Sequence, residues 1–177
     1  MIAPSTEPLP IEEALARLAA PADHYYLKSS SIVESIEHHG RTFYSKFRRI
    51  DEPPNAILLA QHLRREVTLA LPLLRNGYGD KLVIEYLGED PERFLQTLIR
   101  LFDYLDLREY RIFRGKRDTR YTVILSVPRQ ELDALHQLGA RLSDMLQTRL
   151  NKSWRILPDR RLPEHYNIYT LPYGYIN

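Results

Sequence analysis

The stretch from Lys81 to Leu157 decides the fold, and it reads KLVIEYLGEDPERFLQTLIRLFDYLDLREYRIFRGKRDTRYTVILSVPRQELDALHQLGARLSDMLQTRLNKSWRIL. Within it, Asp90 is a typical helix cap and Pro91 fits the first turn, where a missing N–H is not needed. Apolar residues then recur at spacings of three and four, namely Phe94, Leu95, Leu98, Ile99, Phe102 and Leu105. This pattern predicts a core-facing helix after a strand at Lys81–Leu87.

The second half of the stretch also predicts strands and an amphipathic helix. Glu109–Arg114 and Arg120–Val127 are predicted strands that flank a basic turn, and Ser153–Leu157 is a third. Between them we predict a long helix from Pro128 to about Leu150, because leucines recur at helical spacing. The order strand-helix-strand-strand-helix-strand predicts an α+β fold with a ferredoxin-like, RRM-like β-α-β-β-α-β core over residues 81–157. Right-handed crossovers place both helices on one sheet face, so another part of the chain is expected to cover the other face.

The residues before the core predict an N-terminal helix and a β-hairpin extension. Residues 1–10 hold three prolines and are expected to form a flexible leader, followed by a helix at Ile11–Ala20. Ile32–Glu37 and Arg41–Phe47 favour two strands around a His39–Gly40 turn, and a helix over Ile32–His38 is the alternative.

The segment just before the core is expected to supply a helix and a strand. Asn55 is a typical cap for a helix through Glu66, whose buried stripe would be Ile57, Leu58 and Leu63. Val67–Leu74 is a predicted strand, and the Asn76–Asp80 turn is expected to pair it with Lys81–Leu87 in an antiparallel hairpin.

Length and composition predict one domain over residues 1–177. Hydrophobic residues make up 44% and charged residues 27% of the chain, which is ordinary for a globular protein. The last segment, 158–177, carries five aromatic or histidine side chains among prolines. It is expected to pack on the core as a strap, and presentation to a partner is the second interpretation.

The absence of certain features excludes several function classes. The chain has no cysteine, which excludes disulfides, thiolate zinc sites and cysteine nucleophiles. No apolar run approaches the roughly 20 residues that cross a bilayer, and the first residues lack a basic region ahead of an apolar stretch. We therefore expect a cytoplasmic protein with no membrane partner.

One short string carries a resemblance to a known family. Residues 61–74 read QHLRREVTLALPLL, so a helix ending in His-Leu runs through basic residues into a strand and a Pro-Leu. Together with the element order from Asn55 to Val127, this resembles the catalytic module of archaeo-eukaryotic primase-polymerases. The resemblance implies nucleotidyl transfer on an RRM-like sheet. It also implies two metal-binding acids one residue apart on a strand and a phosphate-contacting histidine on a later strand.

The sequence departs from both of these requirements. Glu85 stands at the expected strand position, but its alternate neighbours are Val83 and Leu87, and the later strand offers Tyr121 and Thr122 instead of a histidine. Two-metal phosphoryl transfer needs a carboxylate pair. We therefore predict no catalytic residues, no metal and no cofactor. A metal-dependent transferase built around Glu85 is the least favoured hypothesis.

Positive charge gathers in the second half of the chain. The residues predicted to bind nucleic acid are Arg108, Arg111, Arg114, Lys116, Arg117, Arg120, Tyr121 and Arg155. Cationic side chains neutralise phosphates and exposed rings stack on bases, so the predicted partner is a single-stranded nucleic acid or a replication protein. In another interpretation, Arg111 and Arg114 are solvent-side positions that protect an edge strand from pairing.

The alternative function is a protein-interaction or assembly domain without nucleic-acid binding. It would be a homodimer that pairs through an uncovered sheet face or edge. Histidines offer no competing site. His38 and His39 are adjacent in a turn and point apart, while His62 is expected to cap a helix or lie on the surface.

Overall fold

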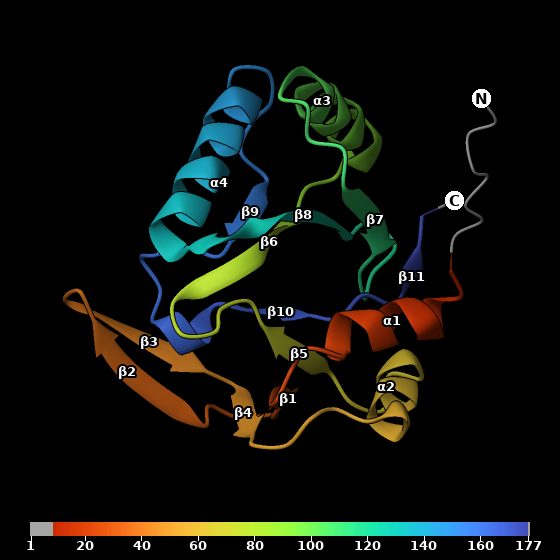
Figure 1. Cartoon of the computed structure of the whole chain (residues 1–177), viewed down its shortest axis with the longest axis vertical. Coiled ribbons are helices and arrows are strands. Elements are labelled where there is room, and N and C mark those ends of the chain that lie inside the picture. Colours follow the sequence, from red (N-terminus) through yellow and green to blue (C-terminus); the bar gives the residue numbers. More distant parts are fainter. Residues whose placement is uncertain (1–8, 177) are drawn as a thin grey trace.

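The computed structural model describes residues 9–176, which form two sheets, a separate hairpin and four α-helices (Figure 1). The helices are α1 (Ile11–Ala19), α2 (Ala56–Leu63), α3 (Pro91–Tyr104) and α4 (Leu132–Gln147), with a short 3-10 helix η1 (Glu164–Tyr166). The strands are β1 (Tyr25–Lys28), β2 (Glu34–His38), β3 (Arg41–Ser45), β4 (Phe47–Ile50), β5 (Leu69–Pro72), β6 (Tyr78–Tyr86), β7 (Tyr110–Arg114), β8 (Tyr121–Glu131), β9 (Trp154–Leu157), β10 (Ile168–Thr170) and β11 (Gly174–Tyr175). Residues 1–8, most of the expected leader, lie outside the described range.

The larger sheet confirms the predicted fold class. Its five strands lie in the order β11-β7-β8-β6-β9, and every neighbouring pair is antiparallel. The chain passes through β6, α3, β7, β8, α4 and β9 in turn, so the core is the predicted β-α-β-β-α-β unit. Both helices lie on one face of this sheet (Figure 1), as right-handed crossovers require.

Helix α3 has the N-terminal cap and the buried apolar stripe that its sequence predicts. The side chain of Asp90 accepts a hydrogen bond from the backbone N–H of Arg93 at 3.2 Å, and Pro91 occupies the first turn. The apolar stripe packs inward, and Phe94, Leu98 and Phe102 are almost fully buried. Local sequence and tertiary packing therefore agree at this helix.

The predicted start of α4 at Pro128 was wrong. Strand β8 continues through residues 128–131, and Gln130 and Glu131 pair with Gly79 and Tyr78 of β6. The register of this pair shifts between Gly79 and Lys81. The irregularity accommodates Pro128, because a proline has no N–H for a regular ladder and is tolerated where pairing is interrupted.

The smaller sheet, in the order β10-β5-β1-β4, covers the other face of the five-stranded sheet (Figure 1). The predicted hairpin between the strands of residues 67–74 and 81–87 was wrong, because β5 pairs with β1 and β10 and not with β6. The turn itself was predicted correctly. Asn76 and Gly77 both have positive φ, and Arg75 and Tyr78 exchange backbone hydrogen bonds at 2.8 and 3.1 Å. The turn carries the chain from one sheet to the other.

The N-terminal hairpin was predicted correctly, and the alternative helix over Ile32–His38 was wrong. Strands β2 and β3 pair from Glu34 opposite Ser45 to His38 opposite Arg41. His39 and Gly40 form the turn with φ values of 48° and 74°, the left-handed conformation that two-residue hairpin turns demand. The hairpin projects from the body of the molecule (Figure 1).

Helix α2 differs from its prediction in length and in orientation. Asn55 caps it through a 2.9 Å hydrogen bond from the N–H of Leu58, as expected. The helix ends at Leu63, and Arg65 beyond it has a positive φ of 64°. Ile57, predicted to be buried, is 70% exposed, whereas His62, predicted to be capping or exposed, is completely buried. The contacts of α2 with α1 and β5 set which face is buried.

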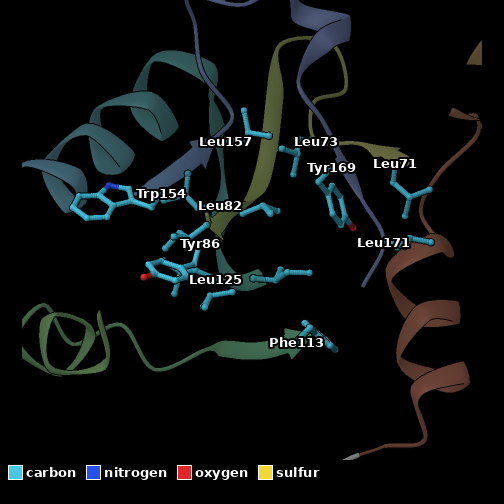
Figure 2. Close-up of a cluster of buried hydrophobic side chains, with 14 of the residues drawn as sticks. Leu71, Leu73, Leu82, Tyr86, Phe113, Leu125, Trp154, Leu157, Tyr169 and Leu171 are labelled. Atoms are coloured by element: carbon cyan, nitrogen blue, oxygen red, sulfur yellow. The ribbon is translucent and has the colours of Figure 1, made fainter. Parts of the chain in front are cut away.

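The hydrophobic core lies between the two sheets and between the larger sheet and helices α3 and α4. Figure 2 shows side chains from both sheets in one cluster, with Trp154, Leu82 and Leu125 from the larger sheet on one side and Tyr169 and Leu71 from the smaller sheet on the other. The C-terminal segment contributes to both sheets, because β10 pairs with β5 and β11 pairs with β7. No helix within the described residues is long and apolar enough to span a bilayer.

Candidate functional site

A pocket of about 220 Å³ lies where the two sheets meet at one end, and we call it the inter-sheet pocket. Its lining comes from β1, the end of β6, the turn after β7, the start of β8 and the C-terminal segment. The lining residues are Lys28, Thr68, Glu85, Tyr86, Leu87, Gly115, Lys116, Arg120, Tyr121, Thr122, Thr170, Leu171 and Tyr173. The pocket is therefore assembled from residues that are far apart in the sequence.

Strand geometry decides which side chains of β6 and β8 reach this pocket. Glu85 pairs in register with Thr122, and Tyr86 pairs with Tyr121. Because side chains alternate along a strand, neighbouring positions point to opposite faces. Tyr86 stacks on Phe94 of α3 with ring centroids 4.6 Å apart, which places it on the helix side. The side chains of Glu85 and Thr122 therefore face the smaller sheet and the inter-sheet pocket.

Three cations converge on the pocket from separate elements. Lys28 ends β1, Lys116 lies in the turn after β7, and Arg120 directly precedes β8. None of the three forms an ion pair with any residue between positions 9 and 176. Positive charge in this recess is thus not neutralised by the protein itself, and it attracts anions.

The only carboxylate lining the described pocket is already paired. Glu85 accepts two hydrogen bonds from Arg155 of β9, at 2.9 Å from Nε and 2.6 Å from the terminal guanidinium nitrogen. This ion pair compensates the negative charge of Glu85 from the neighbouring strand. The three remaining cations consequently determine the sign of the pocket's charge.

Arg120 is the pocket residue that most specifically indicates an anionic ligand. Its Nη1 atom is buried, yet it has no hydrogen-bond partner within the described chain. A buried guanidinium donor without an acceptor is unfavourable by about 1–3 kcal/mol or more, because burial removes its water. The backbone fixes the residue, since Gly115 donates to the Arg120 carbonyl at 2.7 Å and Arg120 donates to the Arg117 carbonyl at 2.9 Å. The guanidinium must turn toward the pocket before an anionic ligand can supply the missing acceptor.

Gly115 is required for this tight turn. A Cβ atom at this position would lie 2.9 Å from the Cβ of Arg120 and 3.1 Å from its carbonyl oxygen. Contacts this short are not accommodated without moving the backbone that positions Arg120. The glycine therefore lets the two ends of the basic turn approach each other.

A buried histidine supports the pocket from behind. His62 of α2 accepts a hydrogen bond from the N–H of Leu69 at Nδ1, at 3.1 Å. Its Nε2 must then carry the proton, and it donates to the carbonyls of Leu171 at 2.9 Å and Pro172 at 3.3 Å. The ring also stacks on Tyr173, with centroids 4.2 Å apart. His62 thus joins α2, the approach to β5 and the C-terminal segment in its neutral form.

Burial also perturbs two ionisable groups at this wall. Burial lowers the pKa of His62, the Leu171 and Pro172 carbonyls raise it in part, and Lys116 lowers it further. Burial raises the pKa of Tyr173, and Thr68 and Arg65 oppose that shift. Arg65 lies over the Tyr173 ring, 5.4 Å from its centroid. Both residues are therefore uncharged around neutral pH.

The lowered pKa of His62 predicts a loss of stability in mild acid. Below the ordinary histidine pKa of about 6.5, the unfolded chain binds a proton at this position and the folded protein does not. The free energy of unfolding should therefore fall as pH drops from about 6.5 toward the folded-state pKa, by at most about 1.4 kcal/mol per pH unit. Urea unfolding between pH 7 and pH 5 measures this slope. His62→Gln should flatten it, and an equal slope in both proteins would contradict the assignment.

The structure brings together only some of the predicted nucleic-acid-binding residues. Lys116, Arg120 and Tyr121 line the inter-sheet pocket. Arg111 and Arg114 are exposed on β7, and Arg117 is exposed in the turn. These last three lie outside the pocket lining.

Two predicted residues are engaged by carboxylates of the protein. Arg108 contacts Asp103 at 2.8 Å and Asp106 at 2.9 Å, and Arg155 contacts Glu85. Arg155 also lies on β9, which β8 and β6 separate from β7. The predicted residues therefore do not all lie together, and three of them, Lys116, Arg120 and Tyr121, share the lining of the inter-sheet pocket.

Three residues of the site were not anticipated. All three lie outside residues 81–157. Lys28 of β1 and Tyr173 of the C-terminal segment line the pocket, and His62 of α2 stacks on Tyr173 behind it. The unusual composition around Tyr173 signalled a docked segment. No local pattern connects Lys28 with the turn that holds Lys116.

The described residues contain no group of three or more histidine, aspartate or glutamate side chains that could hold a metal ion. In particular, the alternate neighbours of Glu85 are Val83 and Leu87 and not acids, and Thr122 stands opposite Glu85 instead of a histidine. The donor set at this position does not fit the two-metal arrangement that the primase-polymerase resemblance implies.

Comparisons with known proteins give two findings. A family model described as a domain of unknown function (DUF1882) matches residues 14–79, the part of the chain from α1 to the start of β6. Among solved structures, the chain is similar to the polymerase domain from Mycobacterium tuberculosis Ligase D in complex with DNA. The two share 14% sequence identity with a TM-score of 0.48, over 78% of this chain and 60% of that chain. No curated protein matches.

Proposed function

We propose that the chain binds the phosphate backbone of a single-stranded nucleic acid in the inter-sheet pocket. The buried, unpartnered Nη1 of Arg120 carries this proposal. A phosphate oxygen is an acceptor that can satisfy a guanidinium donor and remain charged while doing so. Lys28 and Lys116 stand on the same recess and contribute the further positive charge that a phosphodiester chain requires.

The small volume of the pocket, about 220 Å³, favours a single strand over a duplex, because a recess of this size admits a phosphate group of one strand but not a double helix. The rings in the lining are not free to stack on a base in the pocket. Tyr173 is covered by His62 and Arg65, and Tyr121, in register with Tyr86, points to the helix side. Threonine hydroxyls from both sheets, at Thr68, Thr122 and Thr170, add neutral hydrogen-bonding groups around the same recess.

The proposed role is binding without nucleotidyl transfer. Two metal ions on a transferring phosphate need at least a pair of carboxylates. The described pocket offers Glu85 alone, and Arg155 holds it at 2.6 Å. The chemistry available to the remaining residues is charge neutralisation and hydrogen bonding.

Fluorescence anisotropy with a labelled oligothymidylate of about 12 nucleotides tests this function. The variant Lys28→Ala/Lys116→Ala/Arg120→Ala should raise the dissociation constant at least tenfold, which is about 1.4 kcal/mol. If three phosphate contacts are lost, the salt dependence should also weaken by a slope of about 2. An unchanged isotherm in this variant would end the proposal.

The matched control is Arg41→Ala/Arg93→Ala/Arg141→Ala. These three arginines are exposed, lie outside the pocket and form no ion pair in the described part of the chain. The control removes the same net charge, so a merely non-specific attraction would weaken equally in both variants. Binding that falls only in the pocket variant supports the proposed site.

A further inference from the structure

A second recess lies on the helical side of the molecule, between α3 and the end of α4. We call it the helix groove, and its volume is about 310 Å³. Its lining residues are Thr97, Arg100, Leu101, Tyr104, Met145 and Arg149. None of them lines the inter-sheet pocket, so the two recesses are separate sites.

The floor of the helix groove is apolar and carries a notably exposed ring. Tyr104 is 76% exposed, although it stands next to the buried core residues of α3. Leu101 is buried and Met145 half-buried beside it. The hydroxyl of Thr97 already donates a hydrogen bond to the carbonyl of Arg93 at 2.8 Å, so it does not need an acceptor from a ligand. An exposed tyrosine over an apolar floor is typical of a surface that another protein covers.

The rim of the helix groove is positively charged. Arg100 and Arg149 are both exposed, and no carboxylate lines the groove. Across the described residues, neither arginine forms an ion pair. Tyrosine, methionine and arginine are also the residue types enriched at protein interfaces. The groove thus combines an apolar floor with two cations that have no acidic partner within the lining.

We propose that the helix groove docks an acidic amphipathic helix from a partner protein. The apolar residues of such a helix, spaced at i, i+3, i+4 and i+7, would lie on Leu101, Tyr104 and Met145. Glutamate or aspartate residues beside them would face Arg100 and Arg149, so the charges on the two surfaces are complementary. An extended peptide is disfavoured because the walls are helices, whose backbone groups are already bonded and offer no strand edge.

The position of the groove allows both ligands to bind together. Helices α3 and α4 cover one face of the five-stranded sheet, and the smaller sheet covers the other (Figure 1). The inter-sheet pocket is lined by residues of the two sheets and their connecting segments, and no residue of α3 or α4 lines it. A partner in the helix groove would therefore leave that pocket free. This docking surface goes beyond the proposed nucleic-acid function and does not depend on it.

The test uses the full chain and a fluorescein-labelled model peptide of about 18 residues, or five helical turns. The peptide carries leucine at helical spacing with glutamate on either side, and its matched control carries lysine in place of each glutamate. We expect the acidic peptide to bind at least tenfold more tightly than the basic one. Arg100→Glu/Arg149→Glu should abolish that preference or reverse it, and both positions are exposed, so the variant should fold. Tyr104→Ala should weaken both peptides without changing their order.

Three outcomes would overturn the inference. The first is failure of the acidic peptide to bind at any concentration at which it stays monomeric. The second is binding of this peptide to the Arg100→Glu/Arg149→Glu variant as tightly as to the native chain. Alternatively, that variant could lose oligothymidylate affinity as strongly as the Lys28→Ala/Lys116→Ala/Arg120→Ala variant does. That loss would assign the groove to the nucleic acid. Unchanged oligothymidylate binding in the groove variant, together with lost peptide binding, supports two independent sites.

Discussion

Replacing Phe94 with alanine is expected to lower the free energy of unfolding by about 3–5 kcal/mol. Phe94 is only 1% exposed, and its ring stacks between Tyr86 and Trp154 with centroid distances of 4.6 and 5.9 Å. The substitution removes both aromatic contacts and leaves a cavity between α3 and the sheet. Urea unfolding followed by circular dichroism measures the change.

The control for this prediction is Gln96→Ala. Gln96 lies on the exposed side of the same helix, so its replacement should change the stability by no more than about 0.5 kcal/mol. A loss below about 1 kcal/mol at Phe94 would show that the aromatic cluster is loosely packed. In that case α3 would not be anchored as described.

Replacing His62 with alanine should cost about 3 kcal/mol of stability for a different reason. The substitution leaves the N–H of Leu69 and the carbonyl of Leu171 buried without a partner, and it removes the stack on Tyr173. Each unsatisfied buried backbone group costs about 1–3 kcal/mol. Thermal unfolding at neutral pH measures the loss.

A conservative variant separates hydrogen bonding from packing at this position. The amide nitrogen of glutamine can replace Nε2 as the donor to Leu171, so His62→Gln should recover part of the loss. Gln61→Ala, on the neighbouring half-buried position, should change little. If His62→Ala proved as mild as Gln61→Ala, the histidine would not join α2 to the C-terminal segment.

Local signals predicted the elements that local physics determines. The cap at Asp90, the apolar spacing of α3 and the His39–Gly40 turn depend on neighbouring residues alone, and the structure contains all three. The element order of residues 81–157 then left few topologies open, because handedness and antiparallel pairing restrict a two-helix, four-strand unit. The fold class followed from these two steps.

Pairings between distant strands were not predictable in the same way. The Asn76–Gly77 turn has the chemistry of a hairpin, yet β5 finds its partners in β1 and β10. Turn residues determine how the chain reverses, whereas burial against the rest of the molecule determines which strand lies alongside. At Pro128 a local signal led to a wrong helix start. The proline resembles a helix start, and the interrupted register of β8 makes it acceptable within a strand.

The candidate site was predictable only where its residues are close in sequence. Lys116 and Arg120 flank one turn and were both predicted, while Lys28 arrives from another sheet. Both acids that pair with Arg108, Asp103 and Asp106, lie within five residues of it, so its ion pairs had a local signal. Glu85 and Arg155 are 70 residues apart, and only the pairing of β6 with β9 reveals their contact.

The C-terminal segment pairs with both sheets, and this has a consequence for folding during translation. Tyr169 of β10 pairs with Leu71 of β5. Roughly one hundred residues must therefore be translated after β5 before β10 can occupy its second edge. Contacts this distant in the chain form slowly, and an open strand edge invites pairing with other chains in the meantime. The nascent polypeptide should therefore depend on holding chaperones until Tyr175 has emerged and β11 can join β7.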